Sequence, residues 1–321
     1  MPLPDPKDGD KEARGNVLVV AGGTQVPGAA LLAGQAALRA GAGRLQVATC
    51  AGNATSLGLS IPEALVIGMP ETVNGAIDPS HAEQLWPFAE KADAILIGPG
   101  LEDEKAIGDL VLAVLKKVAA PGKFVFDARA IKSLRTAQSV LARQKNEIVI
   151  TPHAGEMAGL MGVERSHVEA DPARIAQQAA KDFRAVIALK GARTVVVSPQ
   201  GERAVCREGN VGLATSGSGD VLAGTIAGLM ARGAPAFAAT CWGVYLHARA
   251  GDRLAKRIGP LGFLARELLL EIPAIMGELR RKQRAAKTKS TGTKQFHRNL
   301  IPYKVATDAS HSGQARRGAM R

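Results

Sequence analysis

Residues 94–128 read AILIGPGLEDEKAIGDLVLAVLKKVAAPGKFVFDA and hold two apolar runs, 94–100 and 123–128, on either side of a helical pattern. Runs as apolar as these are typical of strands in a parallel sheet that is buried on both faces. Parallel neighbours need a crossover between them, and a helix over 103–119 would supply one. The stretch therefore predicts an α/β fold, a three-layer αβα sandwich with a central, mostly parallel sheet.

The same alternation extends in both directions from this unit. We expect further strands over 16–22, 44–49, 64–68, 147–153 and 185–191, and a hairpin over 194–207 that turns at Pro199–Gly201. We expect the other helices over 28–41, 79–91, 154–162, 171–183, 220–232, 236–256 and 264–278. No shift in composition marks a linker between 15 and 279, so the pattern predicts one domain over 15–279.

The net charge of +12 is concentrated at one end of the chain. Residues 280–321 carry 12 Lys or Arg and one acid, Asp308, whereas residues 1–279 are nearly neutral. The tail has no sustained apolar period, so we expect it to be disordered, and we expect a flexible N-terminus over 1–14. A basic tail can bind nucleic acid weakly, but a solvated appendage is the interpretation we favour, and nucleic acid is not an expected partner.

Cysteine usage and the first residues bear on the compartment. The three cysteines, Cys50, Cys206 and Cys241, have no metal-ligand spacing and fit a reducing environment. The first residues contain acids where a signal peptide has an apolar core, and every apolar stretch is broken before about 18 residues. We therefore expect a cytoplasmic protein with no membrane partner.

Polar motifs stand where the predicted strands end, which is where ligands bind in open parallel sheets. They are GPG (98–100), DAR (127–129), TPHAGE (151–156), KGART (190–194) and the opening loop after residue 22. We expect these five strand ends to meet at one crevice.

The loop TSGSGD, residues 215–220, precedes a predicted helix. Gly217 and Gly219 permit a backbone whose N–H groups converge, and the helix N-terminus adds positive charge, so the loop is suited to a phosphoryl group. No Lys follows the last Gly, and Leu222 stands at the third glycine position of the dinucleotide fingerprint, so the loop fits neither common motif. Beside a bound anion, Asp220 would act as general base toward a substrate hydroxyl. The alternative is that Asp220 only caps the helix.

Five motifs taken together resemble one family, the ADP- or ATP-dependent NAD(P)H-hydrate dehydratases of the ribokinase-like superfamily. They are LIGPGL (96–101), ITPHAGEMAGL (150–160), ALKGARTVVVSPQG (188–201), NVGLATSGSGDVLAGTIAGL (210–229) and GVYLHARAGD (243–252). The resemblance runs from about 15 to 275 and implies a ribokinase-like fold.

The resemblance also implies roles for single residues. Asp220 matches the catalytic and substrate-contacting acid, and His153, Gly100 and Ala29 match contacts to the hydrated substrate. The adenine-nucleotide site is matched by Lys190, Gly191, Ala192, Arg193, Thr194 and Gly219, to which the loop geometry adds Gly217. Each match has a structural alternative: a loop cap for His153, a solvated strand end for Lys190, a turn for Gly100 and helix packing for Ala29.

Three further residues near these motifs have other expected roles. We expect Glu156 to hold its loop by capping, and His247, in an Ala-rich helix, to pack in the core. Arg129 stands where many members of the family have an acid or a small residue, so no substrate or metal role is assigned to that position.

The family's reaction is the repair of hydrated NADH or NADPH, here the S-epimer. By resemblance, a phosphoryl group from ADP or ATP activates the ring hydroxyl, and loss of phosphate restores the dihydronicotinamide, so the enzyme class is a carbon–oxygen hydro-lyase. Mg²⁺ is expected with the nucleotide, and its ligands are not identified. A separate NAD(P)H-hydrate epimerase chain and a homo-oligomer, with a tetramer as one form, are expected from the same resemblance.

Two other functions stay open at this point. A ribokinase-like kinase acting on a small alcohol, such as a vitamin precursor, would use the same loop and base. A nucleic-acid or ribosome-associated protein would act through its tail, but the nearly neutral body and the intact loop argue against it.

Overall fold

A nine-stranded sheet lies at the centre of the residues that the computed structural model describes, which are 3–4, 10–118, 121–143 and 145–290. Its strand order is β3-β2-β1-β4-β5-β6-β7-β8-β9. Neighbouring strands are parallel from β3 through β7, and β8 and β9 join as an antiparallel hairpin. The strands are β1 Asn16–Val20, β2 Arg44–Cys50, β3 Ala64–Met69, β4 Ala94–Ile97, β5 Lys123–Phe126, β6 Glu147–Ile150, β7 Val186–Leu189, β8 Thr194–Val197 and β9 Arg203–Cys206.

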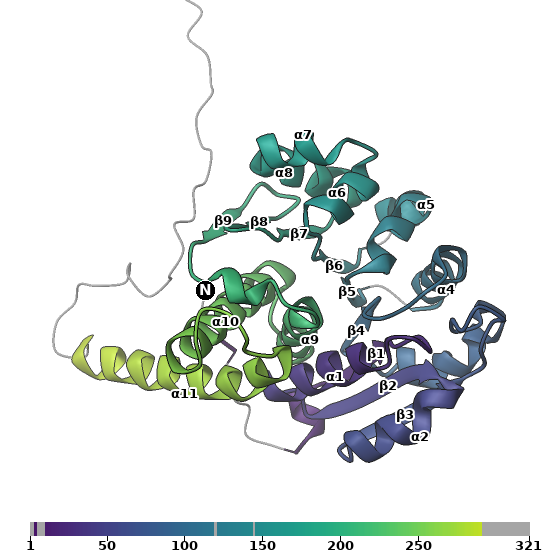
Figure 1. The fold of residues 1–321 in the computed structure, drawn as a ribbon, viewed down its shortest axis with the longest axis horizontal. Coiled ribbons are helices and arrows are strands. Elements are labelled where there is room, and N and C mark those ends of the chain that lie inside the picture. The colour runs from purple at the N-terminus through teal and green to yellow at the C-terminus, as the bar shows by residue number, and fades with distance from the viewer. Residues whose placement is uncertain (1–2, 5–9, 119–120, 144, 291–321) are drawn as a thin grey trace, which may run out of the picture.

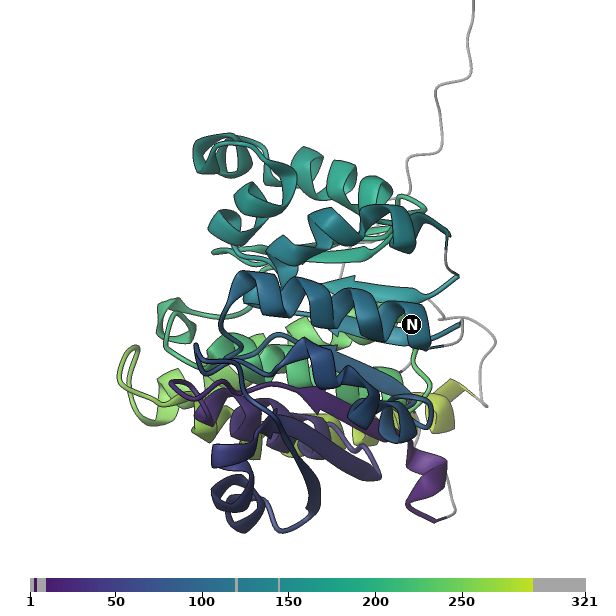
Figure 2. The same ribbon diagram turned by 90° about the vertical axis from the view of Figure 1, so that its right-hand side faces the viewer.

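Helices cover both faces of this sheet, so the expected three-layer α/β sandwich is confirmed (Figures 1 and 2). The first face carries α1 Gly28–Arg39, α9 Ser218–Ala231, α10 Ala236–Arg257 and α11 Ala265–Ser290, with α2 Ala51–Ser60 beside β3. The second carries α4 Glu104–Lys117, α5 Arg129–Arg143, α6 Ala154–Met161 and α8 Pro172–Phe183, together with the short helices α3 Trp86–Ala89 and α7 Arg165–Ala170.

Strand β1 shows how the sequence makes two cores. Val17 and Val19 point into the core under α1 and α9, whereas Leu18 and Val20 point into the core under α4 and α5. All four side chains are 0% exposed, because successive strand residues face opposite sides and both sides are covered. The continuous apolar run in the sequence is the direct result of this double burial.

The strands and the hairpin lie where the sequence predicts them, but the helix predictions need three corrections. Helices α2, α5 and α7 were not expected; α2 buries only Leu57 and so lacks an apolar period. The segment expected as one helix over 79–91 is a 3₁₀ helix, Pro79–Leu85, followed by the short α3. The last helix was expected to end at 278 and instead continues to Ser290.

The ends of the predicted domain also differ from expectation. Leu3, inside the N-terminus expected to be flexible, is 1% exposed, and the Pro4 carbonyl accepts hydrogen bonds from Arg232 at 2.7 Å and Arg280 at 3.0 Å. The predicted tail began at 280, but its first residues belong to α11 because that helix continues past the core. The rest of the predicted tail, 291–321, lies outside the described residues.

Two smaller findings concern the surface and the thiols. Among the described residues, no helix has the length and apolarity needed to cross a membrane. The side chains of Cys50, Cys206 and Cys241 are buried.

Candidate active site

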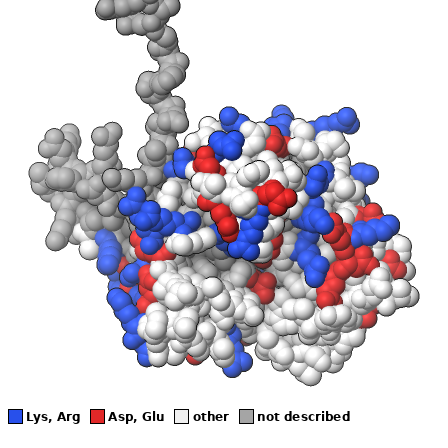
Figure 3. Space-filling model, turned by 45° about the horizontal axis from the view of Figure 1, so that its top comes forward, with Lys and Arg blue, Asp and Glu red and all other residues white. Residues whose placement is uncertain are grey.

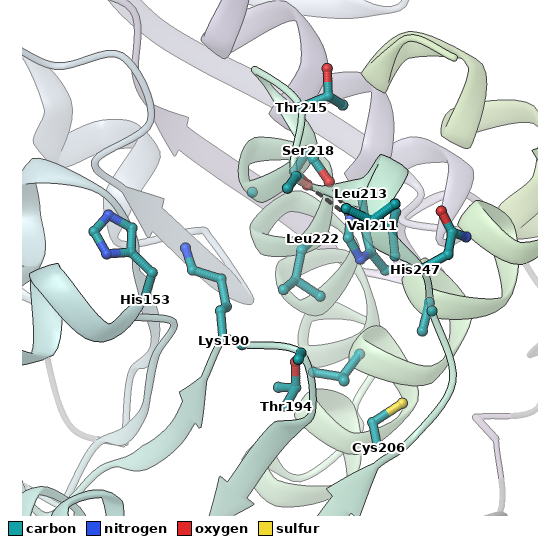
Figure 4. Close-up of a pocket in the computed structure, with 18 of the residues that line it drawn as sticks. His153, Lys190, Thr194, Cys206, Val211, Leu213, Thr215, Ser218, Leu222 and His247 are labelled. Carbon is teal, nitrogen blue, oxygen red and sulfur yellow. Dashed lines mark hydrogen bonds between the residues drawn. The ribbon is translucent and has the colours of Figure 1, made fainter. Parts of the chain in front are cut away.

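A pocket of about 790 Å³ lies at the carboxyl ends of β5, β6 and β7. One wall carries His153 and Lys190 from the ends of β6 and β7, and the opposite wall carries Ser218 of α9 and His247 of α10 (Figure 4). Asp127, which follows β5, also lines the pocket. The volume is that of a site for a small molecule or cofactor. Lys and Arg side chains are mixed with Asp and Glu side chains on the face shown in Figure 3, so neither sign of charge dominates it.

The first turn of α9, where the loop sequence predicts a phosphoryl site, lines the pocket with Ser218, Gly219 and Asp220. Gly217 has φ +83°, a left-handed conformation that favours glycine, and Ser218 begins the helix directly after it. The N–H groups of a helix's first turn have no acceptor inside the helix. Those of Gly219 and Asp220 therefore stand at the positive end of α9, on the wall of the pocket.

Asp220 is the third residue of α9 and does not cap it. The N-cap position is Gly217, with no side-chain cap, so the alternative of a purely capping aspartate is not what the structure has. Burial, and then the negative charge of Asp127, raise the pKa of Asp220 to about 7, although Lys190 opposes the shift. A carboxylate with this pKa is matched to proton transfer near neutral pH.

Asp127 belongs to the DAR motif expected at the crevice, but the sequence assigned it no role. Its carboxylate is 2% exposed, lies 3.0 Å from Lys190 Nζ and accepts a hydrogen bond from Thr151 Oγ1 at 2.6 Å. Lys190 Nζ also lies 3.5 Å from Glu156 Oε2. Burial works against the charge on Lys190, but the two carboxylates outweigh it and raise the pKa of Lys190 above its ordinary value. The sequence feature that could have assigned Asp127 to the site is its place directly after the apolar run KFVF, at the carboxyl end of a predicted strand.

His153 and Glu156 form a capping box at the start of α6. His153 Nδ1 accepts from the backbone N–H groups of Gly155 and Glu156, and Glu156 Oε2 accepts from the His153 N–H at 2.8 Å. The capping role expected for Glu156 is confirmed, and its ion pair with Lys190 adds a second role. His153 lines the pocket with a side chain that is 60% exposed, so it is both a helix cap and accessible to a ligand.

His247 needs a correction, because it was expected to pack only in the core. Its ring lines the pocket, and Nε2 lies 2.9 Å from Ser218 Oγ and 3.0 Å from the Ser218 carbonyl oxygen (Figure 4). Burial lowers the pKa of His247 to about 4, so the ring is neutral at neutral pH. It therefore holds the first turn of α9 as a neutral hydrogen-bonding group.

Ala29 and Gly100 lie together, outside the set of residues that line this pocket. Gly100 has φ +64°, and a Cβ there would come within 2.5 Å of the Val26 carbonyl oxygen and 2.7 Å of Ala29 Cβ. Next to them, Gly98 backs against Asp127, where a Cβ would stand 1.9 Å from the Asp127 carbonyl oxygen. Two of the expected substrate contacts, Ala29 and Gly100, thus lie in a close-packed region that reaches Asp127 through Gly98, whereas the third, His153, lines the pocket itself.

Some of the expected nucleotide-binding residues line the pocket and others do not. The ones that line the pocket are Lys190, Gly191, Ala192, Thr194 and Gly219, whereas Arg193 and Gly217 do not line it. Arg129 begins α5 with an exposed side chain and is not among the lining residues either. In the part of the chain that is described, no three His, Cys, Asp or Glu side chains are grouped to hold a metal ion.

The mostly parallel sheet and its two helical layers define the class of protein: an α/β enzyme of ribokinase-like fold. A family model described as NAD(P)H-hydrate dehydratase matches residues 17–274, and the chain belongs to this family. The expected family, fold and enzyme class, a hydro-lyase, are therefore confirmed.

Individual relatives agree with this assignment. The chain is 48% identical over 281 residues to the ADP-dependent (S)-NAD(P)H-hydrate dehydratase of Xanthomonas campestris, covering 88% of this chain and 94% of that protein. It is 39% identical over 271 residues to the bifunctional NAD(P)H-hydrate repair enzyme of Moorella thermoacetica, covering 84% of this chain and 51% of that one. The Bacillus subtilis ADP/ATP-dependent NAD(P)H-hydrate dehydratase, crystallised with ATP and Mg²⁺, superimposes with a TM-score of 0.71 at 29% identity, covering 86% and 94% of the two chains.

Proposed function

We propose that this chain dehydrates the S-epimer of hydrated NADH or NADPH at the expense of ADP or ATP, with Asp220 as the general base. The observation that carries the proposal is the position of Asp220: a half-buried acid, with a pKa of about 7, in the first turn of a helix whose N-terminus faces the pocket. The identity of 48% to a relative named for the ADP-dependent reaction supports the same substrate and phosphoryl donor.

The proposed reaction has two stages. Asp220 takes the proton of the ring hydroxyl while that oxygen attacks the terminal phosphorus of the nucleotide, and the anhydride bond breaks with its electron pair going to the departing nucleotide. The carbon–oxygen bond then breaks, and its electron pair leaves with inorganic phosphate. Loss of a proton from the neighbouring ring carbon restores the double bond, so the net change in the nicotinamide is loss of water.

The pocket's charged groups fit the first stage. The N–H groups of Gly219 and Asp220 stand where they would stabilise negative charge on the transferred phosphoryl group. The Lys190 ammonium lies close by, since a Cβ on Gly219 would stand 3.5 Å from its Nζ. Both features act on charge that develops during transfer, which is where electrostatic stabilisation increases the rate.

The proposal extends to the groups that accompany the reaction. The described side chains do not form a metal site, so Mg²⁺ would enter mainly on the nucleotide phosphates and water, as it commonly does. His153, Ala29 and Gly100 are proposed to contact the substrate, and Lys190 to Thr194, Gly217 and Gly219 the nucleotide. We also propose a cytoplasmic homo-oligomer that receives the S-epimer from a separate epimerase chain.

The experiment that tests this function follows the near-ultraviolet absorbance of NADH as purified hydrated NADH is repaired, with ADP and with ATP. We expect recovery that depends on nucleotide in the wild type and is at least about a hundredfold slower in Asp220→Asn. The exposed Asp109→Asn, whose carboxylate pairs only with Lys105 among the described residues, is the matched control and should act as the wild type does. Phosphorylation of a small alcohol supplied in place of hydrated NADH, with no recovery of NADH from the hydrate, would instead establish the small-alcohol kinase.

A further inference from the structure

Asp127 lies between the two charged groups that the proposed reaction uses. It follows β5, and its Oδ1 is held by Thr151 Oγ1 at 2.6 Å and paired with Lys190 Nζ at 3.0 Å. Its other oxygen faces α9, because a Cβ on Gly219 would stand 3.8 Å from Asp127 Oδ2. Asp127 therefore touches Lys190 on one side and borders the first turn of α9 on the other.

We propose that Asp127 is a positioning residue of this site: its carboxylate holds the Lys190 ammonium at the first turn of α9 and acts electrostatically on Asp220. The inference rests on the proposed function, and it assigns Asp127 to the reaction without contact to the substrate. Through Lys190, Asp127 would affect binding of the nucleotide's phosphoryl group. Through its charge, it would affect transfer of the substrate's proton to Asp220.

The electrostatic effect on Asp220 comes from a small set of charged groups on neighbouring elements. Asp127 follows β5, Glu156 lies on α6 and Lys190 follows β7, and these three contribute charge at Asp220. The fourth element, α10, faces the same turn with His247, which is neutral near pH 7. Among the two carboxylates, Asp127 has the larger effect on the proton affinity of Asp220, and Glu156 the smaller.

A purely structural role does not account for this arrangement. Replacing a buried ion pair with apolar residues of similar volume is often neutral or stabilising, so the pair between Asp127 and Lys190 is not explained by stability. Both residues line the pocket beside the N-terminus of α9. An ammonium that is already held there would bind a phosphoryl group without the entropy cost of ordering the lysine side chain.

The test is Asp127→Asn, which keeps the shape of the side chain and can still accept the Thr151 hydrogen bond. We expect two changes: the acid limb of the pH profile of kcat/KM moves to lower pH by about one unit, since Asp220 loses a negative neighbour, and KM for the nucleotide rises about tenfold as Lys190 loses its anchor. A structural defect alone would lower activity at every pH and leave the midpoint of the limb in place. An unmoved midpoint with an unmoved nucleotide KM, in soluble Asp127→Asn, overturns the proposal.

Two further variants separate the possible causes. Glu156→Gln keeps the capping box and removes the second partner of Lys190, so its midpoint should move in the same direction but less than that of Asp127→Asn. If Asp127→Asn does not fold, Thr151→Val decides: it removes the hydroxyl that orients Asp127, and we expect a nucleotide KM raised about threefold, whereas an unchanged KM overturns the proposal.

Failure of this inference can be distinguished from failure of the proposed function. Calorimetric titration with ADP or ATP measures the contribution of Asp127 to nucleotide binding without any turnover. Weaker binding to Asp127→Asn in an enzyme that does not repair hydrated NADH would overturn the function and keep Asp127 as the anchor of Lys190. Unchanged binding and an unmoved midpoint in an active enzyme would overturn the inference alone.

Discussion

His247 ties the first turn of α9 to α10 from the wall opposite Lys190. Its Nε2 reaches both the hydroxyl and the carbonyl oxygen of Ser218, so one ring fixes the residue that begins the helix. The ring is neutral because burial lowers its pKa from an ordinary 6.5 to about 4. The loop's geometry therefore depends on a group that resists protonation until the solution is acidic.

This shift predicts a specific loss of stability in acid. A histidine whose folded pKa lies below its unfolded pKa contributes stability above about pH 6.5, and this contribution is lost as pH falls toward about 4. Going from pH 7 to pH 5, the wild type should lose about 2 kcal/mol more than His247→Gln, which cannot titrate. Chemical denaturation of both proteins at the two pH values measures the difference, and equal losses would contradict the pKa assigned to His247.

The sequence identifies single residues that stand in recognisable motifs and misses the contacts that those residues make with distant parts of the chain. Asp220 and Lys190 stand in recognisable motifs and were predicted. Asp127 pairs with Lys190, 63 residues away, and nothing local to either residue reveals the contact. His247 was assigned to the core because its Ala-rich helix indicates packing, and only the tertiary structure places its ring edge against Ser218.

Helices α1 and α9 approach each other through glycine. A Cβ on Gly224 would stand 2.1 Å from the Ala33 carbonyl oxygen, and one on Gly228 would stand 2.5 Å from the Ala37 carbonyl oxygen. The backbones are therefore in contact, with no room for a side chain. Since the first turn of α9 lines the pocket, this contact also sets where that wall of the pocket lies.

The contact gives a prediction with a matched control. Gly224→Ala should destabilise the protein by about 1–3 kcal/mol, because an added methyl group would overlap backbone that cannot move freely. Gly58→Ala in α2 should stabilise it by up to about 1 kcal/mol, because the nearest atom to a Cβ there, on Val66, is 3.8 Å away and alanine is the better helix former. Thermal unfolding of the two variants checks both signs, and a stable Gly224→Ala would refute the close approach.

At the element scale, the sheet was predictable and part of the helical layer was not. Strands buried on both faces give long apolar runs that few other structures produce, so all the expected strands are present. Helix α2 leaves most of its small residues exposed, so its sequence carries no periodic signal. Its position follows from the connection between β2 and β3, which is a tertiary constraint.

The boundary of the folded domain follows from contacts between distant parts of the chain. Arg280 lies in α11, and its guanidinium donates to the carbonyl oxygen of Pro4. Truncation after Leu279 removes this contact and should cost about 1–2 kcal/mol, whereas truncation after Ser290 keeps it and should leave the unfolding temperature as in the full chain. Equal unfolding temperatures for the two truncations would place the boundary at 279, as the sequence predicts.

The pairing of α1 with α9 also has a consequence for synthesis on the ribosome. Helix α1 ends at Arg39 and α9 begins at Ser218, so the small apolar face of α1 is made long before its partner. At the usual pace of about 5–20 residues per second, the wait is on the order of ten to forty seconds. During that time the nascent chain leaves exposed the face of α1 on which α9 will later pack, and apolar surface exposed in this way is prone to aggregation.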